Sequence, residues 1–118
     1  MDPGPLLATT HDAGGLSVRL RLARPSDAPR LHGFLQSHAP SLAPRARSFA
    51  FYDPRERLVV VATAPLEGAE EIVGLADLDS PAPNQATVLV DDRTPSYAVR
   101  RLLEQAAAAL ASRLRHAV

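Results

Sequence analysis

Apolar and charged residues alternate in residues 17–23, and this alternation predicts the first strand of the fold. Val18, Leu20 and Leu22 form one side of the strand, while Arg19 and Arg21 fall on the other. Side chains of a strand point alternately to its two faces, so one face is expected to be buried and the charged face to meet water.

The next apolar residues follow a helical period. Leu31, Phe34 and Leu35 recur at spacings that place them on one face of a helix. The polar residues 26–27 can supply its N-cap. We therefore expect a helix that begins after this cap and ends before Pro40.

Two further apolar runs predict a hairpin. Residues 58–64 read LVVVATA, and residues 71–78 read EIVGLADL after a turn at 65–69. Gly74 interrupts the second run, and a glycine inside a strand commonly marks a bulge or a close backbone approach. Residues 86–90 then predict one more short strand.

The C-terminal segment predicts a helix of roughly 20 residues. Thr94 is expected to cap this helix and Pro95 to occupy its first turn. Its apolar residues recur at helical spacing and predict a face that packs on the sheet: Val99, Leu102, Leu103, Ala106, Leu110 and Leu114.

Together these elements predict an α/β (α+β) fold with the order β-α-(α)-β-β-β-α. It is a mostly antiparallel four-stranded sheet with helices packed on it. Residues 1–16 are rich in proline and glycine and lack periodicity, so they are expected to form a flexible N-terminal tail. Residues 17–118 are long enough for a single domain with its own core.

Composition narrows the classes of function. Thirteen arginines balance thirteen aspartates and glutamates, with no lysine, so the net charge is zero. This balance argues against nucleic acid or an anionic membrane as the main partner. The chain has no cysteine, which excludes thiolate chemistry. Without a leader-like or membrane-spanning apolar run, a cytoplasmic location is expected.

The strand at residues 86–90 enters the last helix through a tight polar turn, which is a natural anion site. The first N–H groups of a helix lack partners within it, and the helix dipole adds positive charge there. Arg93, Ser96 and Ala98 fall on the pattern Q/R-x-x-G-x-G/A, which follows a V-x-V-D strand in the GNAT N-acetyltransferase superfamily. In this junction, and in the order of its elements, the chain resembles that superfamily.

The resemblance implies a GNAT-like domain that transfers an acyl group from acetyl-CoA to an amine on a small molecule or a protein. The strand would pair with the pantetheine arm, and the turn and helix start would hold the pyrophosphate. The residues that the resemblance assigns to acetyl-CoA are Val88, Leu89, Val90, Arg93, Thr94, Ser96, Tyr97, Ala98, Val99 and Arg100. The family normally continues with further strands, which this chain is expected to lack.

The glycines of the family pattern are replaced in this chain. Pro95 has no N–H to offer, and Tyr97 and Val99 are bulky where a backbone should approach a pyrophosphate closely. We therefore expect acyl transfer to be weakened or lost. The alternative is a non-catalytic dimerising or regulatory interaction module. With either function, the uncharged strand at residues 86–90 is expected to be an edge through which a homodimer forms.

No residue is identified as catalytic. An aspartate at a strand end could act as a general base if burial raised its pKa, or could simply form a turn; the four such residues are Asp77, Asp79, Asp91 and Asp92. His32 and His38 do not share a helix face, and no carboxylate pair beside them completes a metal set. Both histidines are therefore expected to be structural, and no metal is expected.

Overall fold

The computed structural model describes residues 7, 9–79 and 86–116, with side chains up to residue 111. It is an α+β fold. The strands and helices are β1 (Thr10–Ala13), β2 (Leu16–Leu22), α1 (Ala28–His38), α2 (Ala46–Ala50), β3 (Arg57–Leu66), β4 (Ala69–Asp79), β5 (Thr87–Val90) and α3 (Ser96–His116). Short 3₁₀ helices, η1 (Pro25–Asp27) and η2 (Pro40–Arg45), precede α1 and α2.

The strands form one antiparallel sheet in the order β1-β2-β3-β4-β5. The predicted mixture of helices with an antiparallel sheet is confirmed. After β1, the elements follow the predicted order, and α1 buries the predicted residues Leu31, Phe34 and Leu35.

The predicted count of four strands is wrong, because the described part of the chain has five. The additional strand, β1, lies within the segment expected to be a flexible tail. Gly14 and Gly15 adopt φ angles of 63° and 93°, which glycine reaches without strain, and they turn the chain back on itself. The Gly15 N–H donates to Asp12 Oδ1 (3.1 Å), and Ala13 is buried, so this hairpin is anchored.

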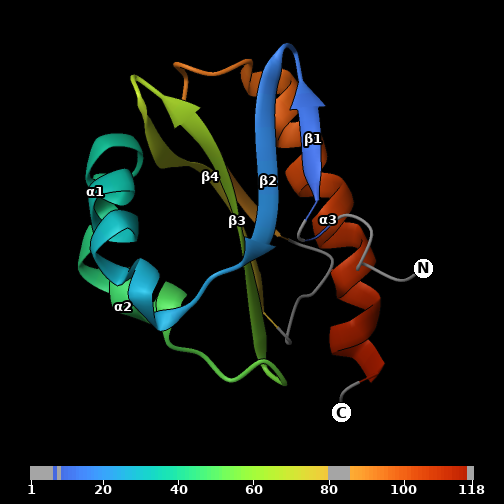
Figure 1. The fold of residues 1–118 in the computed structure, drawn as a ribbon. Coiled ribbons are helices and arrows are strands. Elements are labelled where there is room, and N and C mark those ends of the chain that lie inside the picture. Colours follow the sequence, from blue (N-terminus) through green and yellow to red (C-terminus); the bar gives the residue numbers. More distant parts are fainter. Residues whose placement is uncertain (1–6, 8, 80–85, 117–118) are drawn as a thin grey trace.

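Helices cover both faces of the sheet. α1 and α2 lie on one side and α3 on the other (Figure 1). Apolar residues of β3 and β4 therefore point to two cores: Val59, Val61, Ile72 and Leu75 pack toward α1 and α2, whereas Val60, Ala62, Val73 and Ala76 pack toward α3. Among the described residues, no helix has the length and apolar character needed to cross a bilayer.

Gly74 marks a bulge, as its place within a strand predicted. The β3–β4 register shifts between Ala62 and Thr63, which pair with Gly74 and Ile72 and leave Val73 as an extra residue. α3 packs closely here, since a Cβ on Gly74 would lie 2.8 Å from Leu103 Cδ1.

Candidate functional site

The turn between β5 and α3 is organised by the backbone of Asp91. Its N–H donates to the Val73 carbonyl (2.8 Å), which extends the pairing of β5 with β4 by one residue. Its carbonyl accepts from the Thr94 N–H (3.1 Å), from Thr94 Oγ1 (2.6 Å) and from Ser96 Oγ (3.4 Å). The hydroxyls of Thr94 and Ser96, two of the three in the predicted pyrophosphate loop, therefore bond to the turn itself.

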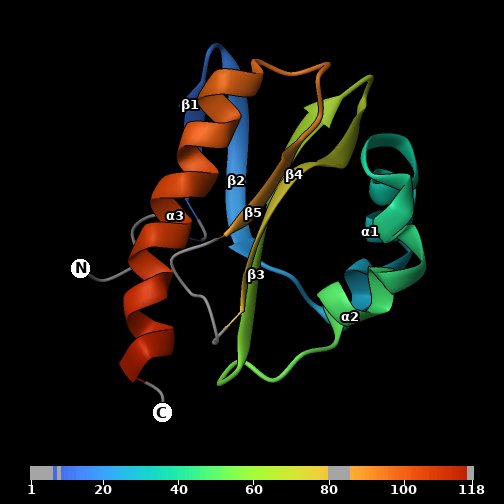
Figure 2. The same ribbon diagram turned by 180° about the vertical axis from the view of Figure 1, so that it is seen from behind.

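The prediction that Thr94 caps α3 is wrong. A capping side chain accepts a hydrogen bond from the helix start, whereas the Thr94 hydroxyl donates backward to Asp91. The helix begins at Ser96, and the Val99 N–H donates to the Pro95 carbonyl at 3.1 Å. Figure 2 shows the chain running from β5 through this turn into α3.

Arg93 is surrounded by carboxylates. Its guanidinium lies 2.7 Å from Asp91 Oδ2, 3.4 Å from Glu71 Oε1 and 3.8 Å from Glu67 Oε1. Its backbone N–H also donates to Asp91 Oδ1 (2.8 Å). The hydrogen bonds to Asp91 raise the pKa of Arg93 above its ordinary value. The positive charge expected to meet a phosphate is thus offset within the chain.

The other residues assigned to acetyl-CoA are spread over different surroundings. Val88 and Val90 pack against the core under α3, and Leu89 packs against the core under α1. Tyr97 is 77% exposed. Val99 is fully buried, Ala98 is half-buried and Arg100 is exposed. The structure therefore brings Arg93, Thr94 and Ser96 together around Asp91 and buries Val99 in the core. Acetyl-CoA contacts at all ten positions stay a prediction.

The structure also places two residues side by side whose contact the sequence did not predict. His38, the last residue of α1, places Nε2 3.4 Å from Asp91 Oδ2, and Phe34 packs on the imidazole with the ring centres 4.8 Å apart. This happens because the end of α1 and the β5–α3 turn lie at the same end of the molecule (Figures 1 and 2). Nothing in the sequence spacing signals the pair, since it depends on the layer order.

A general base at this position would need a raised pKa, and the pKa of Asp91 is lowered. Its side chain is 1% exposed. The hydrogen bonds from Arg93 lower the pKa of Asp91 in spite of this burial, and the nearby His38 lowers it further. Asp91 is therefore an anion at neutral pH, and it can orient the imidazole of His38.

A cavity of about 250 Å³ opens beside this pair, between α1 and the ends of β4 and β5. Its walls include Phe34, Ser37, His38, Glu71, Ile72 and Asp91. A histidine held by a buried carboxylate at the rim of a cavity can accept a proton from a bound amine or hydroxyl.

One imidazole nitrogen of His38 and one carboxylate oxygen each of Asp91 and Asp92 lie within 4.8 Å of one another. This set could ligate a metal by residue type. Arg93 already occupies both carboxylate oxygens of Asp91, at 3.2 Å and 2.7 Å, and would compete with an ion. The expectation of no metal stays a prediction.

The remaining strand-end aspartates are differently placed. Asp77 accepts two hydrogen bonds from Arg57, at 2.7 and 2.8 Å, and Asp79 is exposed at the end of β4. An aspartate held in two hydrogen bonds by a guanidinium serves the structure rather than proton transfer.

No protein-family model matches the chain, and searches of curated proteins and of solved structures find no similar protein. Membership of the GNAT superfamily therefore stays a prediction that rests on the residues of the β5–α3 junction and on the order of the elements.

Proposed function

We propose that this chain is a non-catalytic interaction module that pairs with a second copy of itself, on a scaffold that resembles the GNAT superfamily. The observation that carries the proposal is the neutralisation of Arg93. In the acetyl-CoA hypothesis this guanidinium faces the pyrophosphate. Instead, it contacts three carboxylates, of which Asp91 is buried.

The side chains of the β5–α3 turn fit a pyrophosphate poorly, although the first N–H groups of α3 remain as donors. Phosphates need free N–H and O–H donors and an uncompensated positive charge. The Thr94 hydroxyl donates to the Asp91 carbonyl, and the Ser96 hydroxyl lies 3.2 Å from the Thr94 carbonyl and 3.4 Å from that of Asp91. Pro95 has no N–H. A phosphate near Arg93 would also approach Glu71 and Asp91, and like charges repel at such distances.

The self-pairing surface is the outer edge of β5. Among the described strands, β5 pairs only with β4, and its four residues, Thr87 to Val90, carry no charge. Unpaired backbone groups on an uncharged edge favour pairing with another strand. A second copy presents the same edge, and a two-fold axis lets the two strands satisfy each other.

Calorimetric titration with acetyl-CoA tests the loss of the cofactor. We expect a dissociation constant on the order of 0.1 mM or weaker. Arg93→Ala should leave the titration unchanged but lower the stability of the fold, whereas Arg100→Ala, at an exposed position of α3, should change neither. Low-micromolar binding that both substitutions weaken would overturn the proposal.

N-acyl transfer is the second candidate function, and the pair of His38 and Asp91 favours it. His38 lies beside a cavity and next to a buried carboxylate, where it could take the proton of an acceptor amine. This function requires acetyl transfer to an amine by the unchanged chain and its loss in His38→Gln. Absence of transfer in both proteins favours the interaction module.

A further inference from the structure

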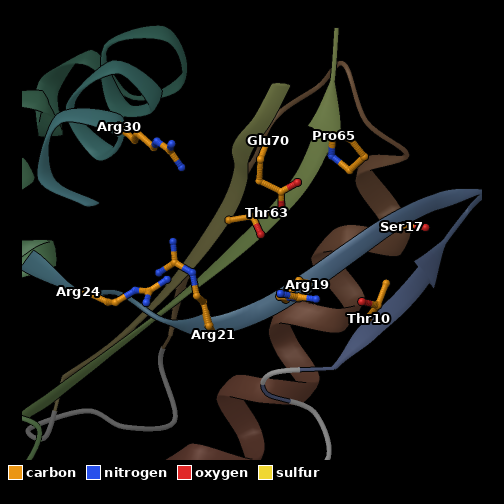
Figure 3. Close-up of a pocket in the computed structure, with 9 residues that line it drawn as sticks. All are labelled: Thr10, Ser17, Arg19, Arg21, Arg24, Arg30, Thr63, Pro65 and Glu70. Atoms are coloured by element: carbon orange, nitrogen blue, oxygen red, sulfur yellow. The ribbon is translucent and has the colours of Figure 1, made fainter. Parts of the chain in front are cut away.

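A second cavity, which we call the arginine basin, lies on the α1 side of the sheet (Figure 3). Its volume is about 430 Å³. It is defined here by Arg19 and Arg21 of β2, Thr63 of β3, Glu70 of β4, Arg24 after β2, and Arg30 of α1. Figure 3 shows Arg30 extending from α1 toward the sheet residues.

The basin exists because helices cover only part of this face. Val18 and Leu20 of β2 pack toward α3, so Arg19 and Arg21 point to the opposite side. There, α1 and α2 pack on the apolar residues of β3 and β4 and leave the polar face of β2 open. The charged side of β2 thus becomes a floor, with α1 as a wall.

Arg21, one of the four arginines of the basin, is held in place by an ion pair. Asp27, which is 3% exposed, holds the Arg21 guanidinium through two hydrogen bonds of 2.7 Å. Arg21 also donates to the Leu22 carbonyl (3.3 Å), and this fixes the guanidinium while leaving other N–H donors of the same group for a ligand.

The other three arginines of the basin, Arg19, Arg24 and Arg30, have no ion-pair partner within the part of the chain that the structure describes. Glu70 is the one carboxylate that lines the basin among the described residues. Counting Asp27 as well, four arginines face two carboxylates, which leaves an excess of two positive charges.

Thr63 offers a hydroxyl to a ligand in the basin. The residue is 3% exposed, and its hydroxyl forms no hydrogen bond within the described residues. Among the described residues, every side-chain oxygen or nitrogen that is fully enclosed has a hydrogen-bond partner. Because the Thr63 hydroxyl has none, it is not enclosed, and it opens to the basin that Thr63 lines. A hydroxyl that faces an open cavity can donate to a ligand or to water.

We infer that the arginine basin binds the phosphate group of a small phosphate monoester. A monoester carries close to two negative charges at neutral pH, which matches the excess charge of the basin. A guanidinium group can donate two parallel hydrogen bonds to two oxygens of one phosphate, and the Thr63 hydroxyl can donate to a third oxygen. The volume suits a small molecule, since pockets for such ligands span about 300–1,000 Å³.

This site is separate from the β5–α3 turn. The basin opens on the α1 side of the sheet, whereas α3 packs on the opposite side. The inference therefore stands whether or not the chain binds acetyl-CoA or pairs with itself.

The test is a calorimetric titration with inorganic phosphate and with phenyl phosphate at low salt. We expect saturable binding that Arg19→Gln combined with Arg24→Gln weakens by about tenfold or more, as for the loss of charge-assisted hydrogen bonds. Both arginines are exposed, so the double variant should fold. The matched control is Arg101→Gln on α3, which should change the affinity by less than about twofold, because only screened long-range charge is lost.

Thr63→Val separates a binding role from a structural one. The substitution keeps the shape of the side chain and removes a hydroxyl without a partner, so the melting temperature should hold or rise while phosphate binding weakens. Absence of saturable binding would overturn the inference, and so would equal weakening by Arg101→Gln. Tighter binding of succinate or of a single-stranded oligonucleotide would assign the basin to carboxylates or to phosphodiesters instead.

Discussion

At the scale of single residues, Gly74 decides how closely α3 approaches the sheet. A Cβ at this position would lie 2.8 Å from Leu103 Cδ1 and 3.0 Å from the carbonyl oxygen of Leu89. The leucine side chain can shift, but the carbonyl belongs to a strand paired with β4. We expect Gly74→Ala to lower the free energy of unfolding by about 1–3 kcal/mol, the usual cost of overpacking a core.

Urea unfolding measures this change, and Gly33→Ala is its control. Gly33 lies in α1, and a Cβ there would meet no heavy atom within 4 Å. Alanine is a better helix former than glycine, so this variant should gain about 0.5–1 kcal/mol. A Gly74→Ala protein as stable as the unchanged chain would contradict the close packing of α3.

Residue-level prediction from the sequence succeeds where a local rule decides the outcome. A glycine inside a strand predicted the bulge at Gly74, and helical spacing predicted the buried residues of α1. Prediction fails for Thr94, because its hydroxyl donates to the Asp91 carbonyl instead of accepting from the start of α3. The contact between His38 and Asp91 could not be predicted from the sequence either, because it depends on the end of α1 lying next to the end of β5.

At the scale of elements, the same reasoning explains why β1 was missed. Its sequence, THDA, lacks the alternation of apolar and polar residues that identifies a strand. Pairing with β2 and the burial of Ala13 stabilise it, and both depend on tertiary contacts. The arginine basin was hidden for a related reason. The alternation in β2 predicted an outward charged face, but the wall formed by α1 follows from the packing of helices.

The edge strand β5 carries a prediction about assembly. Thr87 is exposed, whereas Val88 is half-buried against the α3 core, so Thr87→Lys is the cleaner probe of the edge. We expect the unchanged chain to be a dimer by light scattering at about 0.1 mM, and Thr87→Lys to shift it to monomer, since a charged lysine blocks edge pairing.

Thr10→Lys is the matched control for this experiment. Thr10 is also exposed and begins β1, the strand at the opposite edge of the sheet. The dimer should survive this substitution if β5 forms the interface. An unchanged chain that is only monomeric at this concentration contradicts self-pairing, and dissociation by Thr10→Lys alone would assign the interface to β1.

At the scale of the whole molecule, two arginines of the sheet connect it to the α1–α2 layer. Arg21 of β2 binds Asp27 at the end of η1. Arg57 of β3 binds Asp77, donates to the Ser48 carbonyl (3.3 Å) and lies 4.6 Å from the ring centre of Phe49. These contacts hold a layer whose helices are short, and the pair of Arg21 and Asp27 depends on a carboxylate that stays ionised.

Acid should therefore loosen the fold. Burial alone would raise the pKa of Asp27, but hydrogen bonds from the Arg21 side chain and the Arg24 N–H outweigh it and hold this pKa below the ordinary value. The pKa of Asp91 is lowered as well, chiefly by Arg93. Both groups bind protons more weakly in the folded chain than in the unfolded chain. Their contribution to stability is thus complete above a pH of about 4 and is lost as the pH falls through the lowered values.

Thermal unfolding between neutral pH and about pH 2 measures this loss, and Asp27→Asn isolates one contribution to it. We expect Asp27→Asn to lower stability by about 2 kcal/mol at neutral pH, because two charge-assisted hydrogen bonds weaken, and to flatten the acid limb of the curve. Asp53→Asn is the control. Its pKa is also lowered, by Arg55, but that pair is exposed, so water replaces the contact and the melting temperature should hold. An acid limb equally steep in Asp27→Asn and the unchanged chain would show that other carboxylates hold the layers together.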